Sequence, residues 1–541
     1  MKDISSTGSF VDFTLENFIY VDKTVYIPQL VKLKRVFISR PRRFGKSLTL
    51  DTIATLFETG VEPYFKGTWI YDKWTEPTYP VLRLNFLNFD KNSLEKFNNK
   101  LNSKITEFAE LNHVTTYKEK EEAEDSIDHL LEQLRLENRQ IVILIDEYDC
   151  QMTANINNET LYKQFQEKIK SIYANIKDKF AIKFLGITGV TRLKDVESFS
   201  VGSDIRDITN SSAYSQMIGF TRDEIKKFYI DYLKSAASYE NNCNVDEVTD
   251  TQIESLLDRL AQNYDGYCFD EDYEKKVFST WSVNTFLQSV VDKKKVQFGE
   301  YWYDNGGLPS ILVNYLKTHE LNIFEYLDKD KFLKVSSDDF KNPTALTTIN
   351  QNVLMCQTGY LTLRSDLNKT STVALGIPNG EIYKALNRLL ANNIFKGNTD
   401  ITDDYGRSLL EVGTVDDIIN LFNSALNSVS YDNYPIVSES SVQNMLKLYL
   451  LGAHQEVLSE VHEAKGRADL IVNTDNRRIV FEFKYAKNET ETKAKLSEAV
   501  EQIKTRDYGN ILPKKNELIR IAAVFNADPK VRAFTENQIV P

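Results

Sequence analysis

Cysteine and long apolar segments are scarce in this chain of 541 residues. Its four cysteines are far apart and match no metal-binding spacing, so we expect reduced thiols rather than a disulfide framework. No apolar run approaches the roughly 20 residues that a membrane-spanning helix needs. The first residues, MKDISSTGSF, lack the basic start and apolar core of a secretory signal. These absences predict a cytoplasmic protein without a membrane segment; the cysteines are Cys150, Cys243, Cys268 and Cys356.

Histidine and positive charge are also in short supply. None of the five histidines lies at zinc-ligand spacing with a cysteine, and the net charge of −12 argues against a surface coated evenly for nucleic acid. Basic and acidic residues are equal in number between Tyr431 and Pro541, so the rest of the chain carries the whole negative net charge. That balance permits a local basic groove, although a solvated surface of mixed charge explains it equally well. The groove candidates are Lys465, Arg467, Lys484, Lys487, Lys504 and Arg506.

Apolar residues, in contrast, are plentiful enough for more than one core. Hydrophobic residues make up 42% and aromatic residues 11% of the chain, which indicates a globular protein of two to four domains. From Phe10 to about Asp231, short apolar runs alternate with helical patterns, which predicts a doubly wound parallel sheet. The predicted strands cover residues 36–39, 81–85, 141–145 and 182–188, and the predicted helices cover 46–58, 91–111 and 159–176.

The rest of the chain follows two further patterns. From Glu224 to about Lys396 it is mainly helical, and a polar excursion follows from Gly397 to Ser408. A final block begins near Ser438 and mixes helices with strands, which predicts a separate α/β domain. The middle strands are expected at 360–364 and 373–375; the last block reads helix 439–451, strands 456–461, 469–473 and 478–484, and helix 493–503.

A phosphate-binding loop is indicated after the first predicted strand. The segment Arg40–Ser47 reads RPRRFGKS and leads into a helix, where backbone N–H groups and the helix dipole favour an anion. Lys46 is expected to reach the β- and γ-phosphates of ATP or another NTP, and Ser47 to bind Mg²⁺. Arg40 stands where the usual leading glycine is found, and Gly-Lys-Ser alone also fits an ordinary helix start. The candidate nucleotide-binding residues here are Arg43, Gly45, Lys46 and Ser47.

Two carboxylates follow the strand predicted at residues 141–145. Asp146 and Glu147 come at its C-terminal end, the edge at which open α/β sheets bind ligands. We expect Asp146 to hold Mg²⁺ and Glu147 to polarise the attacking water. Arg192, after the strand at 182–188, either senses the γ-phosphate or pairs with an acid such as Asp195. Together with Lys46, the acidic pair predicts an ATP-hydrolysing site.

A second constellation lies in the last block. Gly466–Arg467 is expected to turn a hairpin, and Asp469 to open the strand that follows. Strand alternation places Glu482 and Lys484 on one face of the next strand, about 5 Å from the strand that carries Asp469. Such oxygen ligands suit Mg²⁺, with Mn²⁺ as the substitute, and a phosphodiester hydrolase needs such an ion.

Each residue of this second constellation has an expected role. Asp469 and Glu482 would bind the metal, and Lys484 would orient the water. Glu439, on the preceding helix, would complete the metal shell, and Gln502, on the following helix, would contact the phosphate or Lys484. The spacing also occurs by chance, because Glu and Lys on one strand face often form a solvated ion pair.

Several segments together resemble a known family. The segments at Tyr20–Thr24 (YVDKT), Arg40–Ser47 and Leu144–Asp149 (LIDEYD) are similar to the signatures of the bacterial AAA-ATPase-like family. That resemblance implies that Arg at position 40 is normal and that a PD-(D/E)XK nuclease domain follows. Asp469 and Glu482–Lys484 (EFK) resemble the motif of that superfamily. Further matching segments are Tyr264–Tyr267, Gln357–Tyr360 and Gly376–Asn379, so the resemblance spans nearly the whole chain.

The sequence thus predicts an α/β protein of three parts. Residues 1–235 would form a P-loop AAA-ATPase-like domain, residues 236–430 a mainly helical lid or regulatory region, and residues 431–541 a restriction-endonuclease-like α/β domain. The favoured function is an NTP-regulated, Mg²⁺-dependent nuclease acting on DNA or RNA, in a protein able to form homo-oligomers. The alternative is a signalling or scaffold ATPase whose last domain binds nucleic acid or a partner without cutting.

Overall fold

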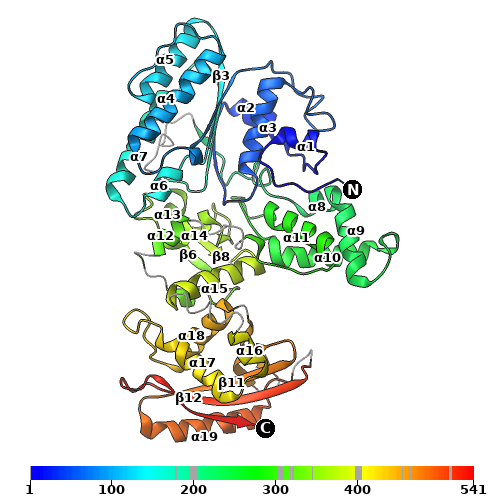
Figure 1. Ribbon diagram of the computed structural model, residues 1–541, viewed down its shortest axis with the longest axis vertical. Coiled ribbons are helices and arrows are strands. Elements are labelled where there is room, and N and C mark those ends of the chain that lie inside the picture. Colours follow the sequence, from blue (N-terminus) through cyan, green and yellow to red (C-terminus); the bar gives the residue numbers. More distant parts are fainter. Residues whose placement is uncertain are drawn as a thin grey trace. The chain divides into compact units, whose positions relative to one another are not determined.

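The chain folds into two compact units (Figure 1). One unit comprises Met1–His319 and Phe332–Ile382, and the other comprises Glu320–Lys331 and Tyr383–Pro541. The boundary near Ile382 therefore lies inside the middle region that the sequence predicts over residues 236–430, and the three-part division stays a prediction. The computed structural model describes residues 2–176, 179–193, 205–302, 310–316, 319, 322–343, 345–395, 405–453, 455–463, 466–510 and 514–541.

A five-stranded parallel sheet forms the centre of the first unit. Its order is β2-β3-β4-β1-β5, and every pair of neighbours is parallel. The strands are β1 (Arg35–Ser39), β2 (Val81–Asn85), β3 (Ile141–Asp146), β4 (Ile182–Gly189) and β5 (Arg206–Asp207). All six residues of β3 are buried, as the apolar run predicts for a strand covered on both faces. The parallel sheet expected from the sequence is confirmed.

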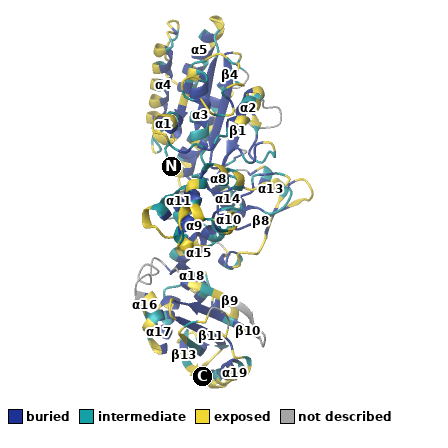
Figure 2. Cartoon of the chain, turned by 90° about the vertical axis from the view of Figure 1, so that its right-hand side faces the viewer, coloured by how far each residue is buried: buried dark blue, intermediate teal, exposed yellow. Residues whose placement is uncertain are grey.

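Helices flank this sheet on two sides. In Figure 1, the helices α4, α5 and α7 lie to one side of β3, and α2 and α3 lie to the other. Figure 2 shows the strands in dark blue because these layers bury them. Their bounds are α2 (Ile27–Leu33), α3 (Lys46–Thr59), α4 (Leu94–Leu111), α5 (Ala123–Leu136) and α7 (Glu159–Ile176). The sequence patterns did not indicate α5, because this helix has more polar residues than buried ones.

Two smaller assemblies complete the first unit. Four helices share one apolar core: α8 (Arg222–Phe228), α9 (Ile230–Asn241), α10 (Asp250–Tyr264) and α11 (Thr280–Lys293). An antiparallel sheet of order β6-β8-β7 joins β6 (Leu333–Ser336), β7 (Thr362–Leu363) and β8 (Thr372–Gly376), next to α14 (Gln351–Thr358) in sequence. The strands β7 and β8 match the predictions, whereas β6 was missed.

The second unit holds another five-stranded sheet, of order β13-β12-β11-β10-β9. Only β11 and β12 run parallel; the other neighbours are antiparallel. Figure 1 shows α17 and α18 on one side of this sheet and α19 on the other. The bounds are α17 (Val415–Asn427), α18 (Glu439–Gly452), β9 (Glu456–Glu463), β10 (Gly466–Asn473), β11 (Arg477–Ala486), α19 (Glu489–Arg506), β12 (Glu517–Asn526) and β13 (Ala533–Val540).

Two features of the second unit differ from the sequence expectations. Gly466 and Arg467, expected in the hairpin turn, already belong to β10, so Asp469 lies within that strand rather than at its start. The strands β12 and β13 were missed, although residues 521–525 of β12 are a buried apolar run.

Among the described residues, no helix has both the length and the apolar character needed to cross a membrane.

Candidate functional sites

The loop between β1 and α3 has the backbone of an anion-binding turn. Arg43 and Gly45 both have positive φ, +69° and +100°, and Gly45 is the N-cap of α3. The left-handed conformation is one that glycine adopts without steric cost. The loop therefore leads directly to the N-terminus of a 14-residue helix, where free N–H groups and the helix dipole attract phosphate.

Lys46 lies across this loop. Its side chain is only 4% exposed, and Nζ donates to the carbonyl oxygens of Arg40 at 3.1 Å and of Pro41 at 3.2 Å. The same ammonium group is 3.6 Å from Glu147 Oε1. The structure thus brings Lys46 and Glu147 together as a buried ion pair.

Ser47 and Asp146 also meet at this edge of the sheet. Ser47 Oγ donates to Asp146 Oδ2 at 2.6 Å, and the Thr188 hydroxyl donates to Asp146 Oδ1. The backbone N–H of Glu147 donates to the same Oδ1 at 3.0 Å. Glu147 has a φ of +54°, and burial is the main reason that its pKa is raised. A hydroxyl and two carboxylates therefore surround the start of α3, a donor set that suits a hydrated Mg²⁺.

The arginines of this region have separate partners. Arg40 is 1% exposed, donates to the Ser39 carbonyl at 2.9 Å and lies 4.2 Å from the Phe269 ring centre. Burial lowers the pKa of Arg40 to about 9. Its side chain thus packs in the interior, which explains how the loop accommodates arginine in place of glycine. Arg43 lies over the Trp281 ring, 4.0 Å from its centre.

Arg192 pairs with an acid that the sequence analysis did not single out. Its Nε lies 2.5 Å from Asp207 Oδ2, at the end of β5. The side-chain amide of Gln357 exchanges two hydrogen bonds with the Arg192 backbone, at 3.2 and 3.1 Å. Asp195, the partner considered from the sequence, lies outside the described residues. The role of Arg192 as a γ-phosphate sensor stays a prediction.

Asp149 is a structural residue that the sequence reasoning missed. Its carboxylate accepts from the Thr191 backbone N–H and from the Thr191 hydroxyl, each at 2.6 Å, and from the Val190 N–H. These bonds tie the end of β3 to the end of β4. A Cβ at Gly189 would come 2.4 Å from the Tyr148 ring, so this close approach requires glycine. The acidic run from Asp146 to Asp149 was the available signal.

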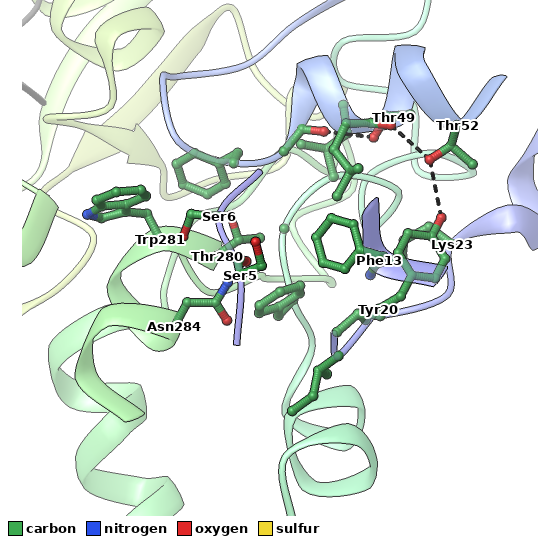
Figure 3. A pocket seen from close by; sticks show the side chains of 18 of the residues that line it. Ser5, Ser6, Phe13, Tyr20, Lys23, Thr49, Thr52, Thr280, Trp281 and Asn284 are labelled. Carbon is green, nitrogen blue, oxygen red and sulfur yellow. Dashed lines mark hydrogen bonds between the residues drawn. The ribbon is translucent and has the colours of Figure 1, made fainter. Parts of the chain in front are cut away.

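A pocket opens beside the loop (Figure 3). Its volume is about 160 Å³. Its walls come from Ser5 and Ser6, from Thr49 and Thr52 of α3, and from Thr280, Trp281 and Asn284 of α11. Arg43 and Gly45 also line it, so the pocket is continuous with the phosphate-binding turn. No local sequence pattern indicates this cavity, because its walls are far apart along the chain.

The second candidate site lies where β10 and β11 pair. The antiparallel ladder between β10 and β11 ends at the pair Leu470–Phe481, and Asp469 and Glu482 are the next residue of each strand beyond that pair. The two carboxylates are close enough for the charge of Asp469 to raise the pKa of Glu482. Phe483 N donates to Asp469 Oδ2 at 2.9 Å, which holds this carboxylate beside β11.

Lys484 links the carboxylates of this site. Its Nζ donates to Glu482 Oε1 at 2.9 Å, to the Phe483 carbonyl at 3.1 Å and to Glu439 Oε1 at 3.2 Å. Glu482 is 0% exposed, and its Oε2 has no hydrogen-bond partner among the described residues. Burial, and then the Asp469 charge, raise the pKa of Glu482 to about 7. Burial likewise raises the pKa of Asp469.

The donor set of this second site fits a hard divalent cation. It offers the buried, unpartnered Oε2 of Glu482 beside the carboxylate of Asp469. In the part of the chain that the structure describes, no three His, Cys, Asp or Glu side chains form a ready-made metal cluster. The ammonium of Lys484 lies between Glu439 and Glu482 and binds to both. A cation that recruits Glu439 would therefore displace this ammonium.

Neighbouring polar groups show which helices support the second site. Gln502 Nε2 is 3.5 Å from the Tyr508 hydroxyl, to which Arg506 also donates at 2.8 Å. The predicted contact of Gln502 with Lys484 stays a prediction. Gln443, one turn after Glu439 on α18, donates to the Asp469 carbonyl and was missed. The spacing of these two residues was the available signal. Lys465, from the predicted basic groove, lies outside the described residues.

Two family models match the chain over the same regions. Residues 5–199 match the model described as predicted AAA-ATPase, and residues 437–535 match the model described as PD-(D/E)XK nuclease superfamily. These matches contain the candidate residues from Arg43 to Arg192 and from Glu439 to Gln502. The two predicted domain types are therefore confirmed.

The chain is similar to a bacterial protein and, more distantly, to two solved structures. An "uncharacterized protein in vnfD 5'region" of Azotobacter chroococcum mcd 1 is 26% identical over 534 residues, covering 95% of this chain and 94% of that protein. Cdc6p from Pyrobaculum aerophilum is 10% identical, with a TM-score of 0.22, over 68% of this chain and 91% of that one. The ORC2 protein of Aeropyrum pernix is 12% identical, with a TM-score of 0.25, over 68% and 93%. TM-scores this low do not establish a shared fold.

The bacterial relative matches this chain nearly end to end. The two family models show that the chain carries an AAA-ATPase-like domain followed by a C-terminal domain of the PD-(D/E)XK nuclease superfamily.

Proposed function

We propose that the protein is a nucleotide-regulated, divalent-cation-dependent nuclease that cuts phosphodiester bonds in DNA or RNA. The observation that carries the proposal is the buried carboxylate of Glu482, whose Oε2 is unpartnered among the described residues and lies beside Asp469 and Lys484. A buried carboxylate without a partner costs stability, so such an arrangement points to a ligand that satisfies it.

The residues of the second unit have complementary roles in this proposal. Asp469 and Glu482 would hold Mg²⁺ or Mn²⁺, and Glu439 would complete the set. The bound cation supplies charge neutralisation at the phosphate and lowers the pKa of water. Lys484, released from Glu439, orients the attacking water and takes part in its deprotonation. Gln502 and Arg506, which both bond to the Tyr508 hydroxyl, would contact a phosphate of the substrate.

The residues of the first unit bind ATP or another NTP in this proposal. Gly45 and Lys46 would hold the phosphates, and the pocket beside Trp281 would receive the base. Ser47 and Asp146 would hold Mg²⁺. A phosphate bound by Lys46 competes with Glu147 for the ammonium, so binding releases Glu147 to polarise a water. Nucleotide binding and preparation for hydrolysis are thereby linked through one ion pair.

Nuclease assays on the purified full-length chain test this proposal. Single- and double-stranded DNA and RNA are incubated with Mg²⁺, Mn²⁺ or EDTA, each with and without ATP. We expect cation-dependent cleavage that ATP alters and that Lys484→Ala removes, whereas Lys530→Ala, a change of an exposed lysine between β12 and β13, leaves it intact. Cleavage that persists in the Lys484→Ala protein contradicts the assigned site. Intact ATP binding without any cleavage favours the signalling or scaffold ATPase instead.

A further inference from the structure

A second cavity of the first unit is lined by basic residues. Its volume is about 760 Å³, and it lies between α2, the segment that follows α3, and the start of β4. We call it the basic bowl and define it by its six cationic lining residues. These are Lys32, Lys34, Arg35, Lys73, Lys179 and Lys183.

The charge of the basic bowl opposes that of the whole protein. Glu76 is the one acidic residue among its described lining residues, whereas the chain carries a net charge of −12. Carboxylates offset two of the lysines: Lys183 lies 2.6 Å from Glu76, and Lys179 pairs with Asp128. The remaining excess of positive charge makes the bowl a local attractor for polyanions.

Aromatic side chains accompany these charges. Phe180 lines the bowl and is 60% exposed. Trp74 also lines it and is half-buried, and its buried indole N–H has no hydrogen-bond partner among the described residues. Lysines beside the exposed Phe180 ring form a surface on which phosphates and a stacked base bind side by side.

The basic bowl is separate from the nucleotide site. It lies where strands begin, because Arg35 opens β1 and Ile182 opens β4, whereas Lys46 and Asp146 follow strand ends. The five residues of β1 span roughly 15 Å at about 3.3 Å per residue. The bowl and the phosphate-binding loop are therefore at opposite edges of one sheet.

We propose that the basic bowl binds a single-stranded stretch of nucleic acid. The lysines contact its phosphates, and Phe180 stacks on an unpaired base. A single strand fits better than a duplex, because bases stacked inside a duplex are not available to the Phe180 ring. The choice of nucleic acid rests on the proposed nuclease function, but binding at the bowl requires no cleavage.

Fluorescence anisotropy with a labelled single-stranded oligonucleotide tests the inference. The full-length chain is used in EDTA and carries Glu482→Gln, so that no cleavage occurs. The test variant is Lys32→Glu with Lys73→Glu, two exposed positions of the bowl. The control is Lys96→Glu with Lys100→Glu on the exposed face of α4, which changes the net charge equally. We expect the test variant alone to lose about tenfold or more in affinity and about two units of salt slope.

A second variant separates stacking from charge. Phe180→Ala should weaken oligonucleotide binding about fivefold or more and leave the binding of inorganic polyphosphate unchanged. Circular dichroism verifies that each variant is folded. Equal affinities of the test and control proteins overturn the inference, as does displacement of the oligonucleotide by polyglutamate at equal charge, which would indicate an acidic protein partner. Failure of the proposed nuclease function would give a different result: the natural protein would not cleave nucleic acid, but the oligonucleotide would still bind at the basic bowl.

Discussion

The two candidate sites differ in how their charged groups are satisfied. In the first unit, Lys46 pairs with Glu147 and Ser47 bonds to Asp146. In the second unit, Lys484 pairs with two carboxylates, yet Glu482 Oε2 remains without a partner among the described residues. The first site is a closed set of mutual bonds that a ligand must open. The second site contains a buried carboxylate oxygen without a hydrogen-bond partner, and a bound cation would satisfy it.

This difference follows from where each backbone places its acids. Parallel strands bring Asp146 and Glu147 to a sheet edge, next to a loop and a helix N-terminus that supply several donors. The antiparallel ladder of β10 and β11 instead brings Asp469 and Glu482 together within the sheet, where one lysine is the principal donor. Like charges held at that spacing raise each other's pKa.

Removal of Lys484 tests the second site and should have the largest effect. Lys484→Ala should lower cleavage by about 10²- to 10⁴-fold, the range of a lost general acid–base group. Initial rates on a labelled substrate measure this loss. Lys530→Ala, a change of an exposed lysine between β12 and β13, is the matched control. Equal rates for the two variants would show that Lys484 does not act in cleavage, and the second site would then lack its proposed catalytic role.

Glu482 should make stability depend on pH. Its folded pKa of about 7 exceeds the ordinary 4.5, so the folded protein keeps a proton that the unfolded chain has lost. The free energy of unfolding therefore falls as pH rises from about 4.5 to 7, by roughly 3 kcal/mol, and stays low above that. Denaturant titrations at pH 5, 6, 7 and 8 measure this slope.

Two comparisons sharpen the pH prediction. Glu482→Gln should flatten the slope, whereas Glu501→Gln, an exposed change on α19, should keep it. Mn²⁺ at pH 8 should raise the free energy of unfolding of the natural protein and not of the Glu482→Gln protein. A slope that survives Glu482→Gln would place the titrating group elsewhere.

Lys46 should matter for nucleotide binding by a smaller amount. Lys46→Ala removes charge-assisted bonds to phosphate and should weaken binding by about 2 kcal/mol, roughly 30-fold. Titration with a fluorescent ATP analogue measures the dissociation constant, with Lys96→Ala as the control. An unchanged constant would mean that Lys46 serves only its ion pair with Glu147.

The smallest predicted effect concerns the pocket beside the loop. Trp281→Ala should weaken ATP binding by about 1 kcal/mol, the typical value of one aromatic contact. Binding of inorganic triphosphate should not change, because it has no base. Calorimetry with both ligands measures this, and Trp69→Ala, a change of an exposed tryptophan outside the pocket, is the control. Equal losses for both ligands would contradict a base-binding role.

Local sequence alone determined the strands that carry both candidate sites, and the main motifs. The apolar run 141–145 predicted a buried strand because such runs are stable only between two layers. The alternation in residues 481–484 predicted the shared face of Glu482 and Lys484 because side chains alternate along a strand. Charged residues within or directly after these strands then marked both candidate sites.

Only the tertiary structure decided the partners of those residues. Arg192 meets Asp207, Gln443 meets the Asp469 backbone, and the basic bowl gathers α2, residues 73–76 and the start of β4. These contacts join segments far apart in the chain, so no local pattern encodes them. The burial that leaves Glu482 Oε2 without a partner likewise depends on the packing of the whole sheet, because burial is set by neighbours rather than by residue type.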